Sequence, residues 1–277
     1  MRLPIPIFTE NKVYTGVEIT RPRASVIADT KTAVDDGQIF GAIKRFLSGC
    51  IKSLLTEDEE EIDDKAEIKR ALSLMPFRSA EHLVLQVMLL VDPDNDGVEG
   101  IYECPRCGKK IVAELIKDDT IDLDTRDFIS MLPVNYMDED EPTITISLQD
   151  PVNLINKNTK EVLDSVESFT LRHPNLNDCM VAERIHGTRD AVRMQFAMYI
   201  EAITEINGNP VDKKYKNTFG MLIFENIKNV REDLGSLNQS VAKYGVNPDV
   251  DKNCNGCGKV FSVPISTSSF FVSGLAL

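Results

Sequence analysis

Apolar side chains recur at helical spacing over residues 38–55. They fall on one stripe of a helix, which predicts an amphipathic helix in this segment. The stripe consists of Ile39, Ile43, Phe46, Leu47, Cys50, Ile51, Leu54 and Leu55. Upstream, Asp29 or Thr30 is a candidate N-cap for a first helix. The first two dozen residues instead alternate and include prolines, which favours short edge strands or an extended arm.

Two further helices are predicted before residue 92. Residues 65–75 fit a short helix that ends at Met75-Pro76. The apolar run at 79–91 indicates a buried helix, with Ser79 as its N-cap.

The second half of the chain mixes both periodicities. Residues 111–155 favour strands, because apolar and polar positions alternate, most clearly at 143–148. From about residue 160 the pattern is mostly helical, with one long helix or two over 176–206. Another helix is predicted over 219–244, closed by Gly245 at its C-cap. We therefore expect an α+β fold that is mostly helical with short strands.

Composition and charge narrow the class of protein. The chain has 277 residues, with 31 Lys and Arg against 44 Asp and Glu, a formal net charge of −13. This balance argues against broad docking on nucleic acid, although a small basic site remains compatible with it. The longest apolar run, 83–91, is too short to cross a bilayer, so membrane insertion is not expected. The N-terminal segment lacks the apolar stretch of a signal peptide, which predicts a soluble protein made in a reducing cytosol.

Six cysteines in such a chain are better interpreted as metal ligands than as a disulfide set. Four of them form two CxxC pairs, Cys104/Cys107 and Cys254/Cys257. The other two, Cys50 and Cys179, lie in helix-like stretches and are expected to be small buried hydrophobic residues. The histidines His82, His173 and His186 lie far apart, without metal-binding spacing, and are expected in the core or on the surface.

Each CxxC pair is followed by Gly and Lys, which suits a tight knuckle that turns two thiolates toward one ion. Two knuckles complete a tetrahedron, so the sequence predicts one structural zinc held by Cys104, Cys107, Cys254 and Cys257. Two alternatives remain open. A redox CxxC would need a thioredoxin-like βαβ setting, and an iron–sulfur cluster could use the same ligands.

The two knuckles are separated by 146 residues, so a shared ion would close a very long loop. We expect three regions: a helical region with the first knuckle at 1–110, strands followed by helices at 111–253, and the second knuckle with the C-terminal tail at 254–277. The last region would fold back onto the first knuckle as one zinc-ribbon-like unit. Because no open coordination position and no nucleotide-binding or hydrolase motif is visible, we do not expect an enzyme.

Two acidic segments have a simple and a functional interpretation. Asp92, Asp94, Asp96 and Glu103 occupy positions 1, 3, 5 and 12 of a candidate calcium loop. The usual apolar eighth position is Glu99 and no helix can follow, which favours an acidic turn instead. The run at 56–64 is either a patch for a cation or basic partner or, more simply, an exposed loop leading into the next helix.

Three stretches, at 21–54, 74–110 and 254–271, resemble a family of tail proteins from contractile-tailed bacteriophages. The most specific parts are GVEGIYECPRCG and CxxCGKVF, and the match covers about a third of the chain. The resemblance implies a non-enzymatic structural part at the centre of the baseplate, the hub, or a helper in tail assembly. It also implies that the family's paired CxxC motifs correspond to the four cysteines above.

The leading hypothesis is a virion protein of the phage tail baseplate, stabilised by zinc. It would act in the virion, and in the host cytoplasm during assembly, as an oligomer in a larger complex with other tail and baseplate proteins. An alternative is a tail assembly chaperone that is not retained in the virion. A third is a zinc ribbon that binds nucleic acid through the basic residues Arg106, Lys109, Lys110 and Lys259, although these more simply offset the thiolate charge.

Overall fold

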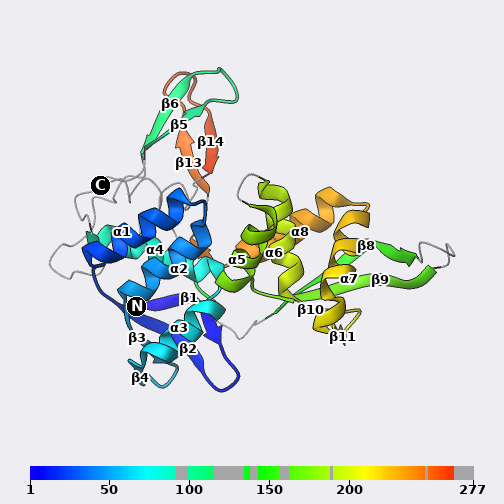
Figure 1. Cartoon of the computed structure of the whole chain (residues 1–277). Coiled ribbons are helices and arrows are strands. Elements are labelled where there is room, and N and C mark those ends of the chain that lie inside the picture. Colours follow the sequence, from blue (N-terminus) through cyan, green and yellow to red (C-terminus); the bar gives the residue numbers. More distant parts are fainter. Residues whose placement is uncertain are drawn as a thin grey trace.

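The computed structural model describes residues 1–91, 99–114, 134–137, 143–155, 162–187, 190–246 and 249–264. Within these ranges it contains eight helices and several antiparallel sheets, which confirms a mixed α+β fold. The expectation of a mostly helical chain overstated the helical content, because strands make up a large share of both halves (Figure 1).

The N-terminal unit is a four-stranded antiparallel sheet covered by helices (Figure 1). The strands, in sheet order, are β1 (Arg2–Phe8), β2 (Val13–Ile19), β3 (Ile51–Thr56) and β4 (Glu61–Ile62). The helices are α1 (Ala24–Asp35), α2 (Ile39–Cys50), α3 (Lys65–Leu74) and α4 (Phe77–Val91). Their apolar faces form the first core, in which Phe46, Leu47, Leu72 and Leu83 are almost fully buried.

Several predicted boundaries in this unit were wrong. The helix expected over 38–55 ends at Cys50, and Ile51 begins β3, because the backbone beyond it pairs with β2. The first helix begins at Ala24, so Asp29 and Thr30 lie inside it; the Thr30 hydroxyl donates to the Val26 carbonyl. The N-terminal residues do form strands, with β1 at the sheet edge, yet their apolar side chains are buried.

Ser79 is not a cap, because it lies inside α4. Its hydroxyl donates to the carbonyl of Ile5 at 2.7 Å and accepts from the Ile5 N–H at 2.9 Å. It therefore connects α4 to the edge strand β1. The acidic run at 56–64 is an exposed turn with a short strand, and Asp64 caps α3 by accepting from the Glu67 N–H. This confirms the simpler interpretation of that run.

The C-terminal unit is a second antiparallel sheet with helices packed against it (Figure 1). In sheet order its strands are β11 (Asn209–Pro210), β10 (Ile203–Ile206), β9 (Val162–Arg172) and β8 (Thr143–Ile155). The second core forms between this sheet and α6 (Ala191–Ala202), α7 (Lys213–Asn226) and α8 (Val230–Ala242). Helix α5 (Leu176–His186) belongs to the first core instead, through Leu176 and Cys179.

The helical expectation from residue 160 was wrong for β9, which pairs with β8 along most of its length. Over 176–206 the two-helix alternative is confirmed by α5 and α6, although the segment ends in the strand β10. The helix expected over 219–244 is α7 followed by α8, which ends at Ala242. Gly245 therefore lies beyond the helix end, in β12 (Gly245–Val246), which pairs with β7 (Val134–Asn135).

Arg78 of α4 joins the two halves of the chain. Its guanidinium donates to the carbonyls of Tyr244 and Val246 and forms an ion pair with Glu81. Gly245 has φ +98°, and a Cβ there would lie 2.9 Å from the Cβ of Arg78. Glycine is therefore required both by the backbone conformation and by the close approach of α4.

Two β-hairpins project from the body as an arm (Figure 1). One consists of β5 (Glu99–Glu103) and β6 (Lys110–Glu114), and the other of β13 (Asp249–Asn253) and β14 (Val260–Pro264). The boundaries predicted at residues 110 and 253 fall within these hairpins. No helix within the described ranges is long and apolar enough to cross a membrane.

Candidate metal centre

The two CxxC motifs form the same turn at the tips of the two hairpins. In the first, the Cys104 N–H donates to the Lys109 carbonyl and the Gly108 N–H donates to the Cys104 carbonyl, both at 2.9 Å. In the second, Cys254, Lys259 and Gly258 repeat this pattern at 2.9 and 2.8 Å. Both glycines have positive φ, +67° and +69°, so the sequence CxxCG specifies this knuckle twice.

The hairpins bring all four sulfur atoms together, within 4.8 Å of one another. The closest pairs join one knuckle to the other: the Sγ atoms of Cys104 and Cys257 are 3.7 Å apart, and those of Cys107 and Cys254 are 3.6 Å apart. A tetrahedron with metal–sulfur bonds of about 2.3 Å has edges of about 3.8 Å. The cluster therefore has the dimensions of a four-thiolate site around a single ion.

Backbone N–H groups point at the sulfur atoms. The Gly256 N–H lies 3.3 Å from the Cys254 Sγ. Hydrogen bonds from the Gly256 and then the Cys257 backbone lower the pKa of Cys254 to about 6, which favours the thiolate. For Cys107, the Lys109 backbone lowers the pKa, but partial desolvation of the sulfur and the three neighbouring thiols outweigh it and raise the pKa to about 11. Four thiols this close do not all ionise without a cation between them.

The described side chains of the arm form one small buried cluster. Within the described residues, its buried cluster consists of Cys104 and Cys254, with Cys257 and Phe261 packed against them. Cys107 is exposed. Four bonds to one ion would therefore connect the two hairpins directly at their tips.

The geometry argues against the two alternatives to a single-ion site, a redox CxxC and an iron–sulfur cluster. Each CxxC lies between two strands, whereas a low-pKa redox CxxC uses the N-terminus of a helix. A polynuclear iron–sulfur cluster places several metal and sulfide atoms between its thiolates, so it needs more room than sulfur atoms 3.6–3.7 Å apart allow. A single ion in a closed, four-coordinate site fits the cluster best.

The other residues singled out from the sequence lie elsewhere. Asp92, Asp94 and Asp96 are outside the described residues, and Glu103 is exposed at the end of β5. Cys50 and Cys179 are fully buried, as expected, and burial raises the pKa of the Cys50 thiol to about 12. His82 and His173 are buried in the body and His186 is half-buried at the end of α5. Among the described residues, none of the three belongs to the cysteine cluster.

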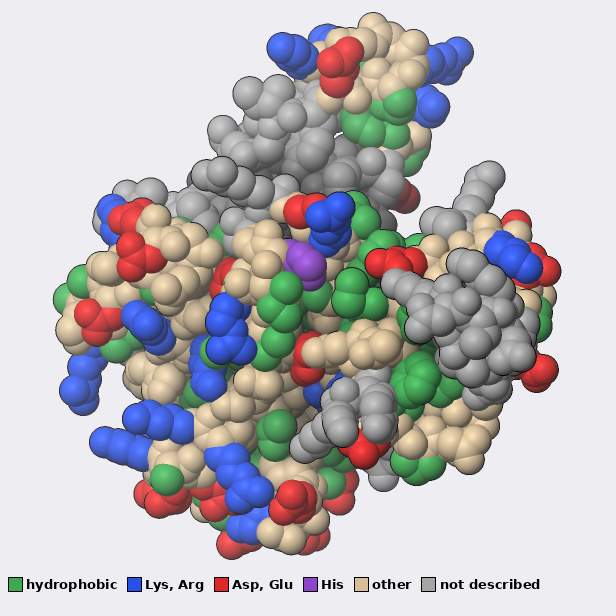
Figure 2. All heavy atoms as spheres, turned by 45° about the vertical axis from the view of Figure 1, so that its right-hand side comes forward, with side chains coloured by type: hydrophobic (Ala, Val, Ile, Leu, Met, Phe, Trp, Pro, Cys, Tyr) green, Lys and Arg blue, Asp and Glu red, His purple; other side chains and the backbone are tan. Residues whose placement is uncertain are grey.

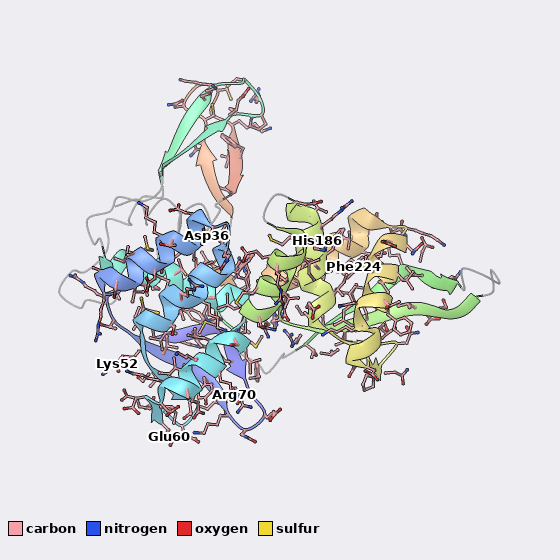
Figure 3. The ribbon with its side chains drawn as sticks, in the orientation of Figure 1. Asp36, Lys52, Glu60, Arg70, His186 and Phe224 are labelled. Carbon is pink, nitrogen blue, oxygen red and sulfur yellow. The ribbon has the colours of Figure 1, made fainter. Side chains whose placement is uncertain are left out.

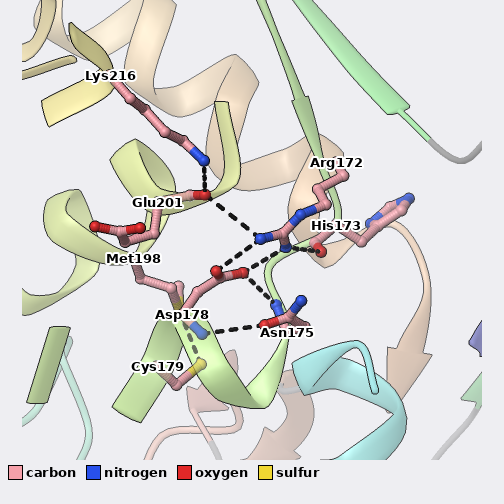
Figure 4. Close-up of polar contacts among 8 residues, drawn as sticks. All are labelled: Arg172, His173, Asn175, Asp178, Cys179, Met198, Glu201 and Lys216. Carbon is pink, nitrogen blue, oxygen red and sulfur yellow. Dashed lines mark hydrogen bonds and ion pairs between the residues drawn. The ribbon is translucent and has the colours of Figure 1, made fainter. Parts of the chain in front are cut away.

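A partly buried polar network at the start of α5 was not predicted (Figure 4). Arg172 forms a two-pronged ion pair with Asp178, at 2.5 and 2.7 Å. Asp178 also accepts from the Asn175 N–H, and the Asn175 side chain accepts from the Asp178 N–H, which together make a capping box. The N-x-x-D spacing was the available signal. The network fixes the turn between β9 and α5.

Comparisons of this chain with protein-family models, with curated proteins and with solved structures find no match. The resemblance to contractile-tail proteins therefore rests on the sequence motifs alone.

Proposed function

We propose that this chain is a non-catalytic structural component at the central hub of a contractile phage tail baseplate, stabilised by a structural zinc and acting through protein–protein contacts. The observation that carries the proposal is the closed cluster of four thiols from two knuckles that are separated by 146 residues in sequence. All four tetrahedral positions are taken by protein sulfur, so no position remains for a substrate or an activated water. Such a site stabilises a fold rather than catalysing a reaction.

Zinc is the proposed ion because a four-cysteine tetrahedral site at paired knuckles is its common structural form. Elemental analysis of the purified, tag-free chain tests this, beside single Cys→Ser variants at each of the four positions. We expect one zinc per chain, lost when either knuckle is broken. Cys50→Ala is the matched control, because Cys50 is buried in the first core and should not change the metal content. Iron in place of zinc, or no metal and a disulfide in a CxxC, would overturn the zinc assignment.

The baseplate assignment is supported by the resemblance, whose most specific segments contain the two knuckles. Mass spectrometry of purified particles from the phage that encodes this chain tests it directly. A hub component should be present at a fixed copy number and should remain when tail tubes and sheaths are removed. A chain required for tail assembly but absent from the particle would be an assembly chaperone instead. Normal contractile tails without the gene would refute both roles.

A nucleic-acid-binding ribbon is the second candidate, and one feature favours it. Arg106, Lys109, Lys110 and Lys259 are all exposed at the outer end of the arm, where Figure 2 shows a group of basic side chains. A gel shift of short DNA or RNA should then weaken steeply with salt and disappear in a Lys109→Gln/Lys110→Gln variant. If no shift occurs at low salt, the chain does not bind nucleic acid, and the basic residues serve to offset the thiolate charge.

A further inference from the structure

The sequence contains two Asn-Gly dipeptides, Asn207-Gly208 and Asn255-Gly256, and both lie in exposed turns. Asparagine is among the thermally labile residues of proteins. When glycine follows, no side chain shields the glycine nitrogen, and that nitrogen can attack the carbonyl carbon of the asparagine side chain. Each dipeptide is therefore a candidate site of spontaneous deamidation, and the structure around it decides whether the reaction occurs.

Asn207 is firmly held in the turn between β10 and β11. Its side-chain oxygen accepts from the N–H groups of Glu167 and Ser168, at 2.8 and 3.2 Å. Its side-chain nitrogen donates to the Ser165 carbonyl at 2.7 Å, and its backbone N–H donates to the Ser168 carbonyl at 2.9 Å. A rotation of the amide group towards the Gly208 nitrogen would break three of these hydrogen bonds. We therefore expect Asn207 to resist deamidation.

Asn255 is held much less firmly. It lies in the second knuckle, between β13 and β14, in the arm at the top of Figure 3. Its side chain is exposed, and no group within the described ranges forms a hydrogen bond with it. The amide group is therefore free to turn. The two sites have the same dipeptide in an exposed turn and differ in how the asparagine is held.

At the second site it is the attacking nitrogen that is restrained. The Gly256 N–H is directed at the Cys254 sulfur, 3.3 Å away. The Lys109 side chain of the first knuckle lies over the same glycine, since a Cβ at Gly256 would lie 2.7 Å from the Lys109 Cδ. This second contact exists only while the two knuckles are together. Whatever holds the knuckles together therefore also limits the movement of the Gly256 backbone.

We propose that Asn255-Gly256 is a modification site that the bound metal protects, so that loss of the metal leads to deamidation of Asn255. The inference rests on the proposed metal site. In the reaction the Gly256 nitrogen bonds to the side-chain carbonyl carbon of Asn255. Its proton passes through water to the side-chain nitrogen, which leaves as ammonia. Water then opens the resulting succinimide ring at either carbonyl group, which gives aspartate or isoaspartate at this position.

Both products should hinder the metal from binding again. Aspartate adds a negative charge next to a cluster of four thiols that must ionise to hold the ion. Isoaspartate directs the main chain through its own side chain, which lengthens the segment between Cys254 and Cys257 by one carbon atom. The knuckle is closed by the hydrogen bond from the Gly258 N–H to the Cys254 carbonyl, which needs the shorter chain. Deamidation therefore makes loss of the metal permanent.

The test compares the full-length chain as purified with the same chain after removal of the metal by a chelator, both incubated in warm neutral buffer. Peptide mapping by mass spectrometry follows asparagine, aspartate and isoaspartate at positions 207 and 255 in one digest. We expect Asn255 to convert about tenfold faster or more in the metal-free chain, because a protected turn must open before it reacts. Asn207 should stay unmodified in both samples and is the internal control.

Asn255→Gln is the matched variant. Glutamine keeps an exposed amide group at this position but would have to form a larger ring, which closes much more slowly. After the same metal-free incubation, the variant should bind metal as fully as before. The chain without a substitution should lose metal binding in proportion to the conversion of Asn255, as elemental analysis measures.

Elemental analysis of the starting material separates two kinds of failure. A purified chain that contains no metal would refute the proposed metal site and this inference with it. A metal-loaded chain in which Asn255 converts as fast as in the metal-free chain would overturn this inference alone. The same holds for a metal-free chain in which Asn207 converts as fast as Asn255.

Discussion

The arm and the N-terminal unit are held together by different means. In the N-terminal unit, side chains from seven of its helices and strands pack, together with α5 and Val246, into one continuous core. In the arm, two hairpins meet through four cysteines and Phe261 among the described residues. A small unit buries too little apolar surface to compensate for the entropy of ordering its chain. We therefore expect a bound ion to contribute more to the stability of the arm than to that of the body.

The largest effect should follow from breaking the metal site. Cys254→Ser should reduce the bound metal from one ion per chain to almost none, because it removes one of four ligands. Amide hydrogen exchange should then accelerate throughout β5, β6, β13 and β14, while protection in α2 and α4 is largely retained. Elemental analysis and hydrogen exchange with mass spectrometry measure the two changes.

Removal of the metal by a chelator should give the same hydrogen-exchange pattern in the chain without any substitution. If the arm stays protected in the metal-free state, the hairpins are held together by something other than the ion. The arm would then keep its structure without the ion, as the body does.

The converse change is Phe46→Ala, which removes a fully buried ring from the first core. Such a truncation lowers the free energy of unfolding by about 4 kcal/mol, because the transfer free energy is lost and a cavity remains. For a protein of this size the melting temperature should fall by about 10 °C. The metal content should stay at one ion per chain. Thermal melts followed by circular dichroism, with elemental analysis of the same sample, check both.

Phe46→Leu is the control for this experiment, since it keeps most of the apolar volume and should lower stability by about 1 kcal/mol. Loss of the metal in Phe46→Ala would contradict the separation of the two regions, because it would show that the body's core also maintains the arm.

The sequence was most informative where a residue type specifies its own geometry. The CxxCG repeats identified both knuckles, and helical spacing placed α3 and most of α2 correctly. It failed where a distant partner decides the structure. Ile51 continues an apolar stripe but becomes a strand because β2 offers it backbone partners. Ser79 looks like a cap but bonds to Ile5, 74 residues away. The hollow between the end of α5, α6 and α7 likewise arises only when these three helices are placed together.

Acid should weaken the two regions for different reasons. His82 is buried and, among the described residues, neither ring nitrogen has a hydrogen-bond partner. Burial, and then the charge of the N-terminal ammonium group, lower the pKa of His82 to about 4. The unfolded chain, with a histidine pKa near 6.5, binds more protons between these values. The contribution of neutral His82 to the free energy of unfolding is therefore complete above about pH 6.5. It is lost as the pH falls towards 4, and at pH 5 the loss is about 2 kcal/mol.

Denaturant unfolding at pH 7 and pH 5 measures how the free energy of unfolding of the body changes with pH. His82→Phe should remove most of this change while keeping a ring against Tyr136. The arm should still release its metal in acid in this variant, because its thiolates are protonated independently. An unchanged slope in His82→Phe would mean that other groups in the body carry the acid sensitivity.

The smallest predicted effect isolates the backbone of a knuckle. Gly258 has φ +69°, and a Cβ added there would meet no atom within 4 Å, so Gly258→Ala introduces only the strain of the left-handed conformation. That strain is about 1 kcal/mol, which should weaken metal binding about fivefold in a chelator competition. Gly258→Asn should weaken it less, because asparagine adopts this conformation more readily. Gly108, at φ +67°, should respond to the same pair of substitutions in the same order. If only one knuckle responds, the two knuckles do not hold the ion equally, although their backbone hydrogen bonds match.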